Sequence, residues 1–301
     1  MELINENYYI DGLKVLDLCE KYGTPLYVYD TSKMIEQYNK MFNAFTCPKV
    51  KINYACKALT NKNILRLFKN LGSGLDCVSI QEVWQGLIAG FNPQDIIFTP
   101  NCVSFEEIAL AVKESVKVNI DNISILDQFG HEYGNKVPIC IRINPHIMAG
   151  SNSKISVGHI DSKFGISIHQ IPLVERIIKT HNIVVEGIHM HTGSDILDVD
   201  VFLQGAEILF EVAKKFPDIK YIDFGSGFKV PYKPDDIATD IEELGQKISA
   251  RFNEFTSESG KEITLMFEPG KYLVSEAGYF FVTVNVVKQT TSTIFAGVDS
   301  G

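Results

Sequence analysis

The chain has 301 residues, of which 45% are hydrophobic and 22% charged, a composition typical of a globular protein with a sizeable core. Its 28 Lys and Arg against 37 Asp and Glu give a formal net charge of −9. This balance argues against nucleic acid or an anionic membrane as a partner, because both need a basic face. The amino-terminal residues lack a signal-peptide pattern, no apolar run approaches the ~20 residues of a membrane span, and six scattered cysteines form no CxxC pair. We therefore expect a cytoplasmic protein.

Short β-branched runs alternate along the chain with longer stretches of helical spacing. The first pattern predicts strands near residues 50–56, 73–78, 95–99, 116–121, 137–143, 183–190, 219–224 and 262–267. The second predicts helices near residues 32–45, 61–71, 80–89, 104–113, 122–133, 169–180, 199–215 and 237–257. Ser104 and Glu107 have the spacing of a capping box, and helix carboxyl ends are expected at Gly72, Gly90 and Gly134.

Eight strands alternating with eight helices predict an α/β fold, a parallel (β/α)8 TIM barrel over residues 31–267, since each parallel crossover needs its helix. A doubly wound open sheet is the alternative. We expect residues 1–30 to pack with a second, β-rich C-terminal domain that starts within residues 268–301, where Val, Thr and Phe alternate as in antiparallel strands. One or two strands cannot form a stable sheet alone, so we expect this domain to be truncated at Gly301 or completed by a partner.

A barrel of this kind carries its reactive groups at the carboxyl ends of its strands. In this sequence those ends are polar, whereas the strands before them are apolar. The residues concerned are Lys57, Asp76, Asn101, Asp121, Arg142, Asn144, His191, Ser194, Gly225, Ser226, Gly227, Glu268, Gly270 and Lys271. This contrast is the main functional signal in the sequence.

Lys57 follows the first barrel strand, in the segment YACKA. A lysine at a strand exit is most often a solvated surface side chain. At a barrel mouth, however, a partly desolvated lysine can form a Schiff base with an aldehyde.

His189 and His191 are two residues apart on the sixth barrel strand, so their side chains point to one face. The pair is compatible with a metal site, with packed or hydrogen-bonded histidines, and with an aromatic platform for a flat cofactor. The Gly193-Ser194 turn that follows favours the cofactor, because it offers a backbone N–H and a hydroxyl to an anion.

The GSG turn at 225–227 and the EPG turn at 268–270 follow strands seven and eight, where barrels of this type frequently bind phosphate. Glycine lets the backbone approach phosphate oxygens, although a GSG turn alone is a weak signal. Glu268 cannot serve a phosphate, since like charges repel, but it suits a protonated pyridine nitrogen. A lysine for an aldehyde, glycines for a phosphate, a histidine for a ring face and a glutamate for a ring nitrogen together describe pyridoxal 5′-phosphate.

The sequence resembles the fold-type III pyridoxal-phosphate-dependent decarboxylases in motifs that follow the family's order over nearly the whole chain. These motifs are GTPLYVYD (23–30), YACKA (54–58), GLDCVS (74–79), INPH (143–146), KISVG (154–158), SKFGI (162–166), GIHMHTGS (187–194), DFGSGF (223–228) and EPGKYLV (268–274). The resemblance implies that Lys57 forms the Schiff base, that His191 stacks on the ring and that Glu268 contacts the pyridine nitrogen. It further implies phosphate contacts from Ser194, Gly225, Gly227 and Gly270, with Asp76 near the Schiff base and Arg142 in the pocket floor.

Three departures from the family pattern are visible. The family usually has GGG at 225–227, and it usually has an arginine, in contact with substrate carboxylate or cofactor phosphate, at the position of Lys271. Lysine keeps the charge but lacks the bidentate fork, so we expect a weaker or rearranged contact. The family's C-terminal β-domain, with the Cys and Tyr that complete the site across a dimer interface, is almost wholly absent from residues 268–301. The resemblance implies that the acid that protonates the substrate Cα lies in that C-terminal domain. We therefore expect residues 1–301 alone to be inactive.

The resemblance implies a homodimer with shared active sites that decarboxylates a small-molecule amino acid. The segments GTPLYVYD, KISVG and SKFGI favour meso-diaminopimelate, which would yield L-lysine and CO2. Decarboxylases of ornithine, arginine or carboxynorspermidine share the cofactor residues and stay as alternatives.

Two other classes of protein stay open on the sequence. A metal-dependent barrel hydrolase would use His189 and His191, with Asp223 or Asp299, as ligands. A non-catalytic regulator would keep the fold and lose the chemistry. The presence of Lys57 together with His191, Ser194 and Glu268 argues against the regulator.

Overall fold

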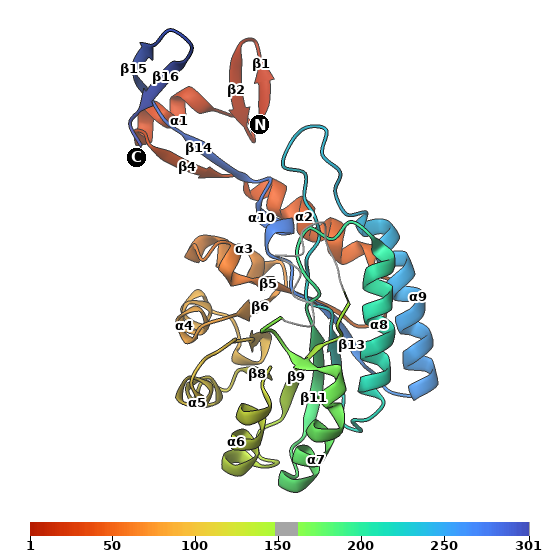
Figure 1. Ribbon diagram of the computed structural model, residues 1–301. Helices are drawn as coiled ribbons and strands as arrows, with labels where there is room; N and C mark the ends of the chain where they lie inside the picture. The colour runs from red at the N-terminus through yellow and green to blue at the C-terminus, as the bar shows by residue number, and fades with distance from the viewer. Residues whose placement is uncertain (148–161, 301) are drawn as a thin grey trace. The chain divides into compact units, whose positions relative to one another are not determined.

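The computed structural model describes residues 1–147 and 162–300 (Figure 1). The chain divides into two compact units, one formed by Met1–Glu36 with Val274–Gly301 and the other by Gln37–Leu273. The KISVG motif at 154–158 and Gly301 lie outside the described residues. No helix in the described part of the chain is long and apolar enough to cross a membrane.

The larger unit is a closed parallel barrel enclosed by helices (Figure 1). Its strands pair in the order β5-β6-β7-β8-β9-β11-β12-β13, and β13 pairs with β5 to close the ring. They are β5 (Val50–Ala55), β6 (Gly74–Cys77), β7 (Ile96–Phe98), β8 (Lys117–Ile120), β9 (Ile139–Asn144), β11 (Val185–Met190), β12 (Tyr221–Asp223) and β13 (Thr264–Phe267). The predicted TIM barrel is confirmed, and the open-sheet alternative is wrong.

The barrel strands are buried because helices cover their outer faces. β6, β7, β9, β11 and β12 are buried along their whole length, which explains their nearly continuous apolar sequences. The helices are α2 (Thr31–Ala44), α3 (Lys62–Asn70), α4 (Ile80–Ala89), α5 (Phe105–Lys113), α6 (Ile123–Tyr133), α7 (Ile171–His181), α8 (Val199–Ala213) and α9 (Ile241–Ser259). All eight predicted helices are therefore present, with small shifts at their ends.

The structure adds short elements that the sequence did not predict. They are the strand β10 (Ile166–Ser167), which pairs with β9, the helix α10 (Lys271–Val274), and the 3-10 turns η1 (Cys56–Ala58), η2 (Pro93–Asp95) and η3 (Ile168–Gln170). Each has four residues or fewer, too few for a periodic pattern to reveal.

The predicted capping box at the start of α5 is wrong. Ser104 does precede the helix, but its side chain makes no capping hydrogen bond to the first turn. The Glu107 carboxylate is used elsewhere: its Oε1 accepts a hydrogen bond of 3.0 Å from the backbone N–H of Ile80, the first residue of α4. Glu107 thus joins two neighbouring helices, a contact that local spacing cannot predict.

Of the three glycines predicted to end helices, two directly follow the last residue of their helix. Gly90 follows α4 with φ of +97° and Gly134 follows α6 with φ of +55°, both in the region that favours glycine. The helix α3 instead ends on Leu71 in a right-handed conformation, and Gly72 comes one residue later with φ of +89°.

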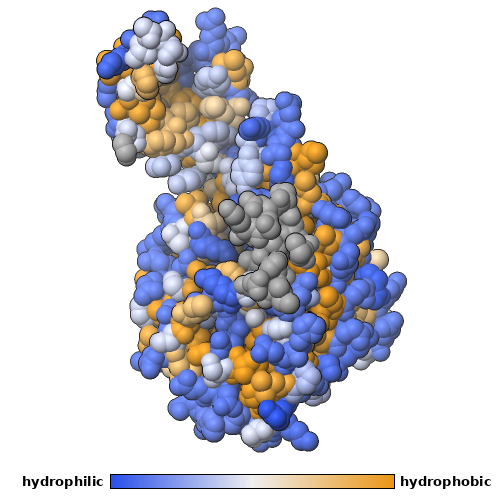
Figure 2. All heavy atoms as spheres, in the orientation of Figure 1, coloured by the Kyte–Doolittle hydropathy of each residue, from blue (hydrophilic) through white to orange (hydrophobic). Residues whose placement is uncertain are grey.

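The smaller unit is built from antiparallel strands. β1 (Glu2–Ile4), β2 (Asn7–Ile10) and β3 (Leu13–Lys14) form one sheet, followed by α1 (Val15–Tyr22). β4 (Leu26–Tyr29) pairs with β14 (Gly278–Phe281), and β15 (Val284–Gln289) pairs with β16 (Ile294–Val298). The β-rich tail predicted from the sequence is confirmed. Apolar side chains are exposed on it, including Val287 at 64% and Ile294 at 66%, and Figure 2 shows such side chains (orange) at the surface of both units.

The exposed cap of α9 provides a test of helix stability in the barrel unit. Asp240 Oδ1 accepts hydrogen bonds of 3.0 Å from the backbone N–H groups of Glu242 and Glu243. Asp240→Ala leaves both donors without this acceptor, and we expect it to lower the free energy of unfolding by about 1 kcal/mol. Urea denaturation followed by circular dichroism measures the change. Asp235→Ala, in an exposed loop, is the control and should change it far less.

Candidate active site

A pocket of about 260 Å³ lies at the carboxyl ends of the barrel strands. Eight of the residues singled out in the sequence line it together: Lys57, His191, Ser194, Ser226, Gly227, Glu268, Gly270 and Lys271. They come from the segments that follow β5, β11, β12 and β13, which are far apart in the sequence. The barrel thus brings most of the predicted site to one place.

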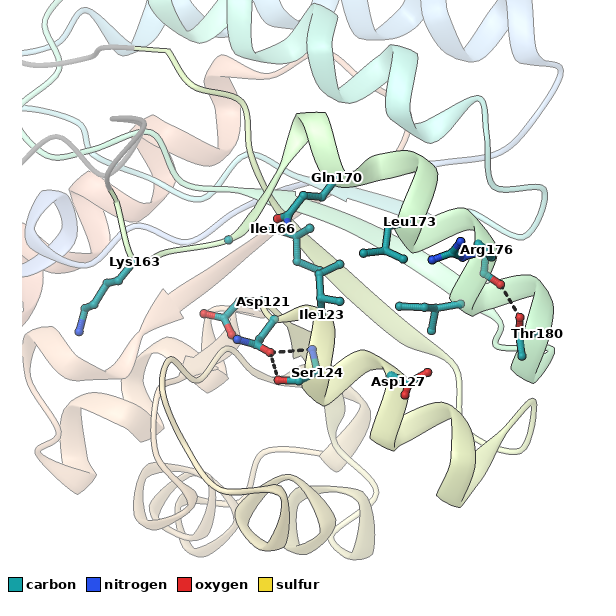
Figure 3. A pocket seen from close by; sticks show the side chains of 13 residues that line it. Asp121, Ile123, Ser124, Asp127, Lys163, Ile166, Gln170, Leu173, Arg176 and Thr180 are labelled. Atoms are coloured by element: carbon teal, nitrogen blue, oxygen red, sulfur yellow. Dashed lines mark hydrogen bonds between the residues drawn. The ribbon is translucent and has the colours of Figure 1, made fainter.

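Two other strand-end residues lie elsewhere. Asn101 Nδ2 donates a hydrogen bond of 2.5 Å to Asp121 Oδ2, and both line a separate cavity. Asp121 also borders the larger pocket of about 720 Å³ between α6 and α7, shown in Figure 3. The hydrogen bonds drawn there are local to each helix, such as that from the Thr180 hydroxyl to the Arg176 carbonyl. This larger pocket therefore lacks the convergent groups of the smaller one.

Lys57 lies in the 3-10 turn that directly follows β5. Its side chain is exposed at the pocket, whereas the sequence led us to expect a partly desolvated lysine. Beside β5, the register pairs Ala55 with Asp76 of β6, and the charge of Lys57 lowers the pKa of the buried Asp76 carboxyl against the larger effect of burial. Lys57 therefore combines access from solvent with acidic neighbours.

Glu268 is buried next to two other ionisable side chains. Its Oε2 lies 3.0 Å from Nε2 of His189, and Asp223 completes a group in which one polar atom from each side chain lies within 4.8 Å of the other two. Burial raises the pKa of Glu268, and the charges of Lys57 and Arg142 oppose that rise. Burial and the charge of Glu268 together raise the pKa of Asp223 well above its usual range.

His189 accompanies this group as a neutral imidazole. Burial, followed by the charges of Arg142 and Lys57, holds its pKa well below the usual value. A neutral His189 can donate through Nε2 to an ionised Glu268, which keeps the carboxylate in place. The other carboxyl oxygen, Oε1 of Glu268, is buried without a hydrogen-bond partner in the described part of the chain.

Arg142 is the buried cation of the barrel interior. Only 7% of it is exposed, and its guanidinium lies 4.9 Å from the ring centroid of Phe164 in the SKFGI segment. In the sheet it pairs with His189, which in turn pairs with Asp223. A layer of charged and polar groups therefore crosses three adjacent strands beneath the pocket.

His191 is fixed by a backbone donor. The N–H of Ser226 donates a hydrogen bond of 3.2 Å to Nδ1, so the ring proton of the neutral imidazole is on Nε2. Burial, with the charges of Arg142 and Lys57, holds the pKa of His191 well below its usual value. The ring is therefore neutral and held in one orientation at the pocket wall.

The glycines at 225 and 227 are required by close approach. Gly225 has φ of +61°, and a Cβ there would lie 2.5 Å from the carbonyl oxygen of Met190. Gly227 has φ of +116°, and its Cβ would lie 2.2 Å from the carbonyl oxygen of Gly193. Ser226 between them uses only its backbone in the contact with His191, which explains why GSG can stand where the family has GGG.

Lys271 is engaged by two side chains that the sequence did not single out. Its Nζ lies 2.8 Å from Oδ1 of Asp195 and 2.8 Å from the hydroxyl of Tyr232. Partial burial lowers the pKa of Lys271, but the hydrogen bonds to Asp195 and Tyr232 outweigh it and raise the pKa overall. Lys271 thus stays charged at the pocket and is held by Asp195 and Tyr232.

The arrangement does not match the metal site that the sequence left open. His189 does lie with Asp223, but Glu268 takes the third place of that group and His191 is bound by Ser226. Asp299 lies in the other unit, where it accepts a hydrogen bond from Thr24. Among the described residues, His191 is thus not part of the group that contains His189, as the alternative metal site would require.

Comparison with known families decides between these chemistries. The profile of the pyridoxal-dependent decarboxylases, pyridoxal binding domain, matches residues 31–275. The chain belongs to this family. Its members are pyridoxal-phosphate-dependent enzymes, and the non-catalytic and metal-hydrolase alternatives have no such support.

The relatives of this pyridoxal-dependent decarboxylase that we compare share one name. It is 36% identical to the diaminopimelate decarboxylase of Methanothermobacter thermautotrophicus, over 97% of this chain and 70% of that protein. It is 32% identical to the enzyme of the same name from Bacillus subtilis, with the same coverage of 97% and 70%. The solved structure of the Helicobacter pylori diaminopimelate decarboxylase with L-lysine has a TM-score of 0.85 at 30% identity, covering 95% of this chain and 73% of that one.

The pocket of this decarboxylase fits the family's cofactor. A lysine for the aldehyde, a glycine-lined turn without room for a Cβ, and a buried carboxylate with one unpartnered oxygen occur around one cavity. Sequence analysis missed Asp195 and Tyr232, which lie 76 and 39 residues from Lys271. No local spacing connects them, and only the charge of Lys271 signalled that an acidic partner was needed.

The buried Asp76 carboxyl predicts a pH dependence of stability. Burial and the charge of Glu268 raise the pKa of Asp76 to about 7 in the folded protein. The stabilisation by the neutral carboxyl is therefore fully present below the pKa of an unfolded Asp, ~3.9. That contribution is lost as the pH rises through about 7. Between about pH 5 and about pH 8, the free energy of unfolding should therefore fall by about 2 to 3 kcal/mol less in Asp76→Asn than in the unchanged protein.

Urea unfolding at the two pH values measures this difference. Asp218→Asn, at an exposed position, is the control and should follow the unchanged protein. An Asp76→Asn variant with the same pH dependence as the unchanged protein would contradict the burial of an ionisable Asp76.

Proposed function

We propose that this protein decarboxylates meso-diaminopimelate to L-lysine and CO2 with pyridoxal 5′-phosphate held in the pocket of Lys57. The observation that carries the proposal is the convergence of Lys57, neutral His191, buried Glu268 and the glycine turn on one cavity at the barrel mouth. The names of the relatives support the choice of substrate.

Each pocket residue has a role that its environment suits. Lys57 is exposed to an incoming aldehyde and binds the cofactor covalently. His191, fixed by Ser226, stacks on the cofactor ring. Glu268, oriented by His189, holds a proton on the pyridine nitrogen, because a buried carboxylate favours a cation beside it.

The phosphate is bound by the backbone of the pocket. Gly225, Gly227 and Gly270 are the glycines assigned to it, and Ser194 adds a hydroxyl; Ser194, Gly227 and Gly270 line the pocket, whereas the N–H of Gly225 donates to Asp223 Oδ1 and this glycine shapes the turn. Arg142 and Asp76 balance the buried charge in the pocket floor, where each acts electrostatically on Glu268 or on its neighbours. When bound, pyridoxal phosphate supplies the electron sink for the pair left by departing CO2.

Lys271 binds the substrate or the cofactor phosphate from the rim. Its ammonium is charged, lines the pocket and is held by Asp195 and Tyr232. A carboxylate of the amino-acid substrate is the preferred ligand, because Asp195 already neutralises part of the charge that a phosphate dianion would need. Ornithine, arginine and carboxynorspermidine are the alternative substrates.

We further propose that the protein is a homodimer with shared active sites, located in the cytoplasm, that residues 1–30 and 268–301 belong to its β-rich domain, and that residues 31–267 form the barrel domain. The exposed hairpin of β15 and β16 supports an interface, since apolar strands such as these are normally covered. The six cysteines are all free thiols, which suits a reducing compartment.

Lys57→Ala should abolish the visible absorbance of the bound cofactor and its covalent retention. Borohydride reduction of the unchanged protein, followed by peptide mapping, should place the cofactor on Lys57. Lys62→Ala, at an exposed position on α3, is the matched control and should retain the absorbance. A label on Lys163 or Lys271 would overturn the assignment.

Glu268→Gln should leave the fold and cofactor binding largely intact but slow decarboxylation by several orders of magnitude. A neutral amide cannot hold the pyridine proton, and each lost pKa unit of the ring nitrogen removes about 1.4 kcal/mol of preference for its protonated form. CO2 release from meso-diaminopimelate by the intact protein measures the rate, with the exposed Glu262→Gln as control. Near-normal turnover would refute the role of Glu268, and faster turnover of ornithine or arginine would refute the substrate.

Sedimentation equilibrium of the intact protein should give the mass of a dimer. Val287→Glu on β15 places a charge on an exposed apolar strand, and it should shift the equilibrium toward the monomer at least tenfold. Lys113→Glu, on α5 of the barrel unit, also introduces a glutamate but not on the hairpin, and it should leave the mass unchanged. A monomer at all concentrations would contradict the shared site.

A further inference from the structure

The carboxyl ends of α6 and α7 bring together three potential metal ligands. Asp127 and His131 are one turn apart on α6, so they share a face, and His181 is the last residue of α7. The ligand atoms of the three side chains all lie within 4.8 Å of one another. His181 Nε2 is 2.9 Å from Asp127 Oδ1, and the ring centroids of His131 and His181 are 4.4 Å apart.

This cluster is separate from the active-site pocket. α6 ends shortly before β9 begins, and α7 ends shortly before β11 begins, so both helix ends lie at the amino-terminal face of the barrel. None of the three residues lines the Lys57 pocket. Figure 3 shows Asp127 on α6, beside the residues of α7 that border the larger pocket.

The packing of the two helices holds His181 in place. A Cβ at Gly130 would lie 2.6 Å from the His181 ring, so the glycine is what allows this ring to lie against α6 between Asp127 and His131. The His181 side chain is only 11% exposed, whereas that of Asp127 is 51% exposed. One ligand is therefore anchored, and the site is open to an ion from solvent.

The local electrostatics favour a cation. The carbonyl groups at the carboxyl ends of α6 and α7 carry partial negative charge, and both ends converge near the cluster. Asp127 adds a full negative charge. An Asp–His ion pair alone would account for His181 but not for the second imidazole, His131, whose ring lies 4.4 Å from that of His181 at a tilt of 58°.

We propose that Asp127, His131 and His181 bind a divalent transition-metal ion, with Zn²⁺ as the first candidate. Two imidazoles and one carboxylate are ligands that suit zinc and are a poor set for Mg²⁺ or Ca²⁺, which prefer oxygen. Three protein ligands leave a fourth position for water. A bound ion would join the ends of α6 and α7, which are separate in the sequence.

Isothermal titration of ZnCl2 into the chelator-treated, cofactor-loaded protein tests the site, after unbound cofactor is removed. We expect one zinc equivalent that is lost or weakened more than tenfold in His131→Asn and in Asp127→Asn, because removal of a direct ligand costs at least as much as removal of a supporting contact. Zinc should also raise the thermal unfolding midpoint of the unchanged protein but not of His131→Asn. His131 and Asp127 are exposed, so neither change should disturb folding in the absence of zinc.

His169→Gln is the matched control, because His169 is also exposed and stacks on another histidine, His146. It should bind zinc as the unchanged protein does. Zinc K-edge absorption should show nitrogen and oxygen bonded to the metal. The proposal is overturned if the unchanged protein fails to bind an equivalent of zinc, if His131→Asn binds it with unchanged affinity, or if sulfur is bonded to the metal.

Discussion

The site depends on the burial of the Glu268 carboxylate inside the barrel. A carboxylate removed from water must be compensated by hydrogen bonds and opposite charge, or it takes up a proton. Here His189 lies 3.0 Å from Glu268 Oε2, and Lys57 and Arg142 act on it as charges. The remaining buried oxygen, Oε1, keeps a capacity for one more donor. A protonated ring nitrogen supplies that donor in the proposed function.

Strand register is what assembles these groups. β9, β11 and β12 are parallel neighbours, and their pairing aligns Arg142 with His189 and His189 with Asp223. Glu268 comes two residues after Met266, the partner of Asp223 on β13. A slip of one residue in any of these strands would turn its polar side chain toward the helices. The apolar residues that alternate with them therefore fix both the core and the position of the charges.

The sequence predicted the barrel because short apolar, β-branched runs alternate with segments of helical period, and it predicted the pocket because parallel strands end at one face. Eight strand-end residues, from Lys57 to Lys271, line the same cavity for this reason. The sequence did not predict side-chain contacts between distant segments. Glu107 bonds to Ile80 instead of closing a capping box, and Lys271 is held by Asp195 and Tyr232. Such contacts depend on how loops and helices meet, which no local pattern records.

The contact between Ser226 and His191 has a consequence for how this turn can vary among proteins. The donor is a backbone N–H, so the side chain at position 226 is not needed to orient the imidazole. The two flanking positions have backbone conformations and neighbours that exclude a Cβ. Substitution should thus be tolerated at position 226 and not at positions 225 and 227. In a GGG turn at this place, the first and third glycines would be required by the backbone geometry, whereas the central one would not.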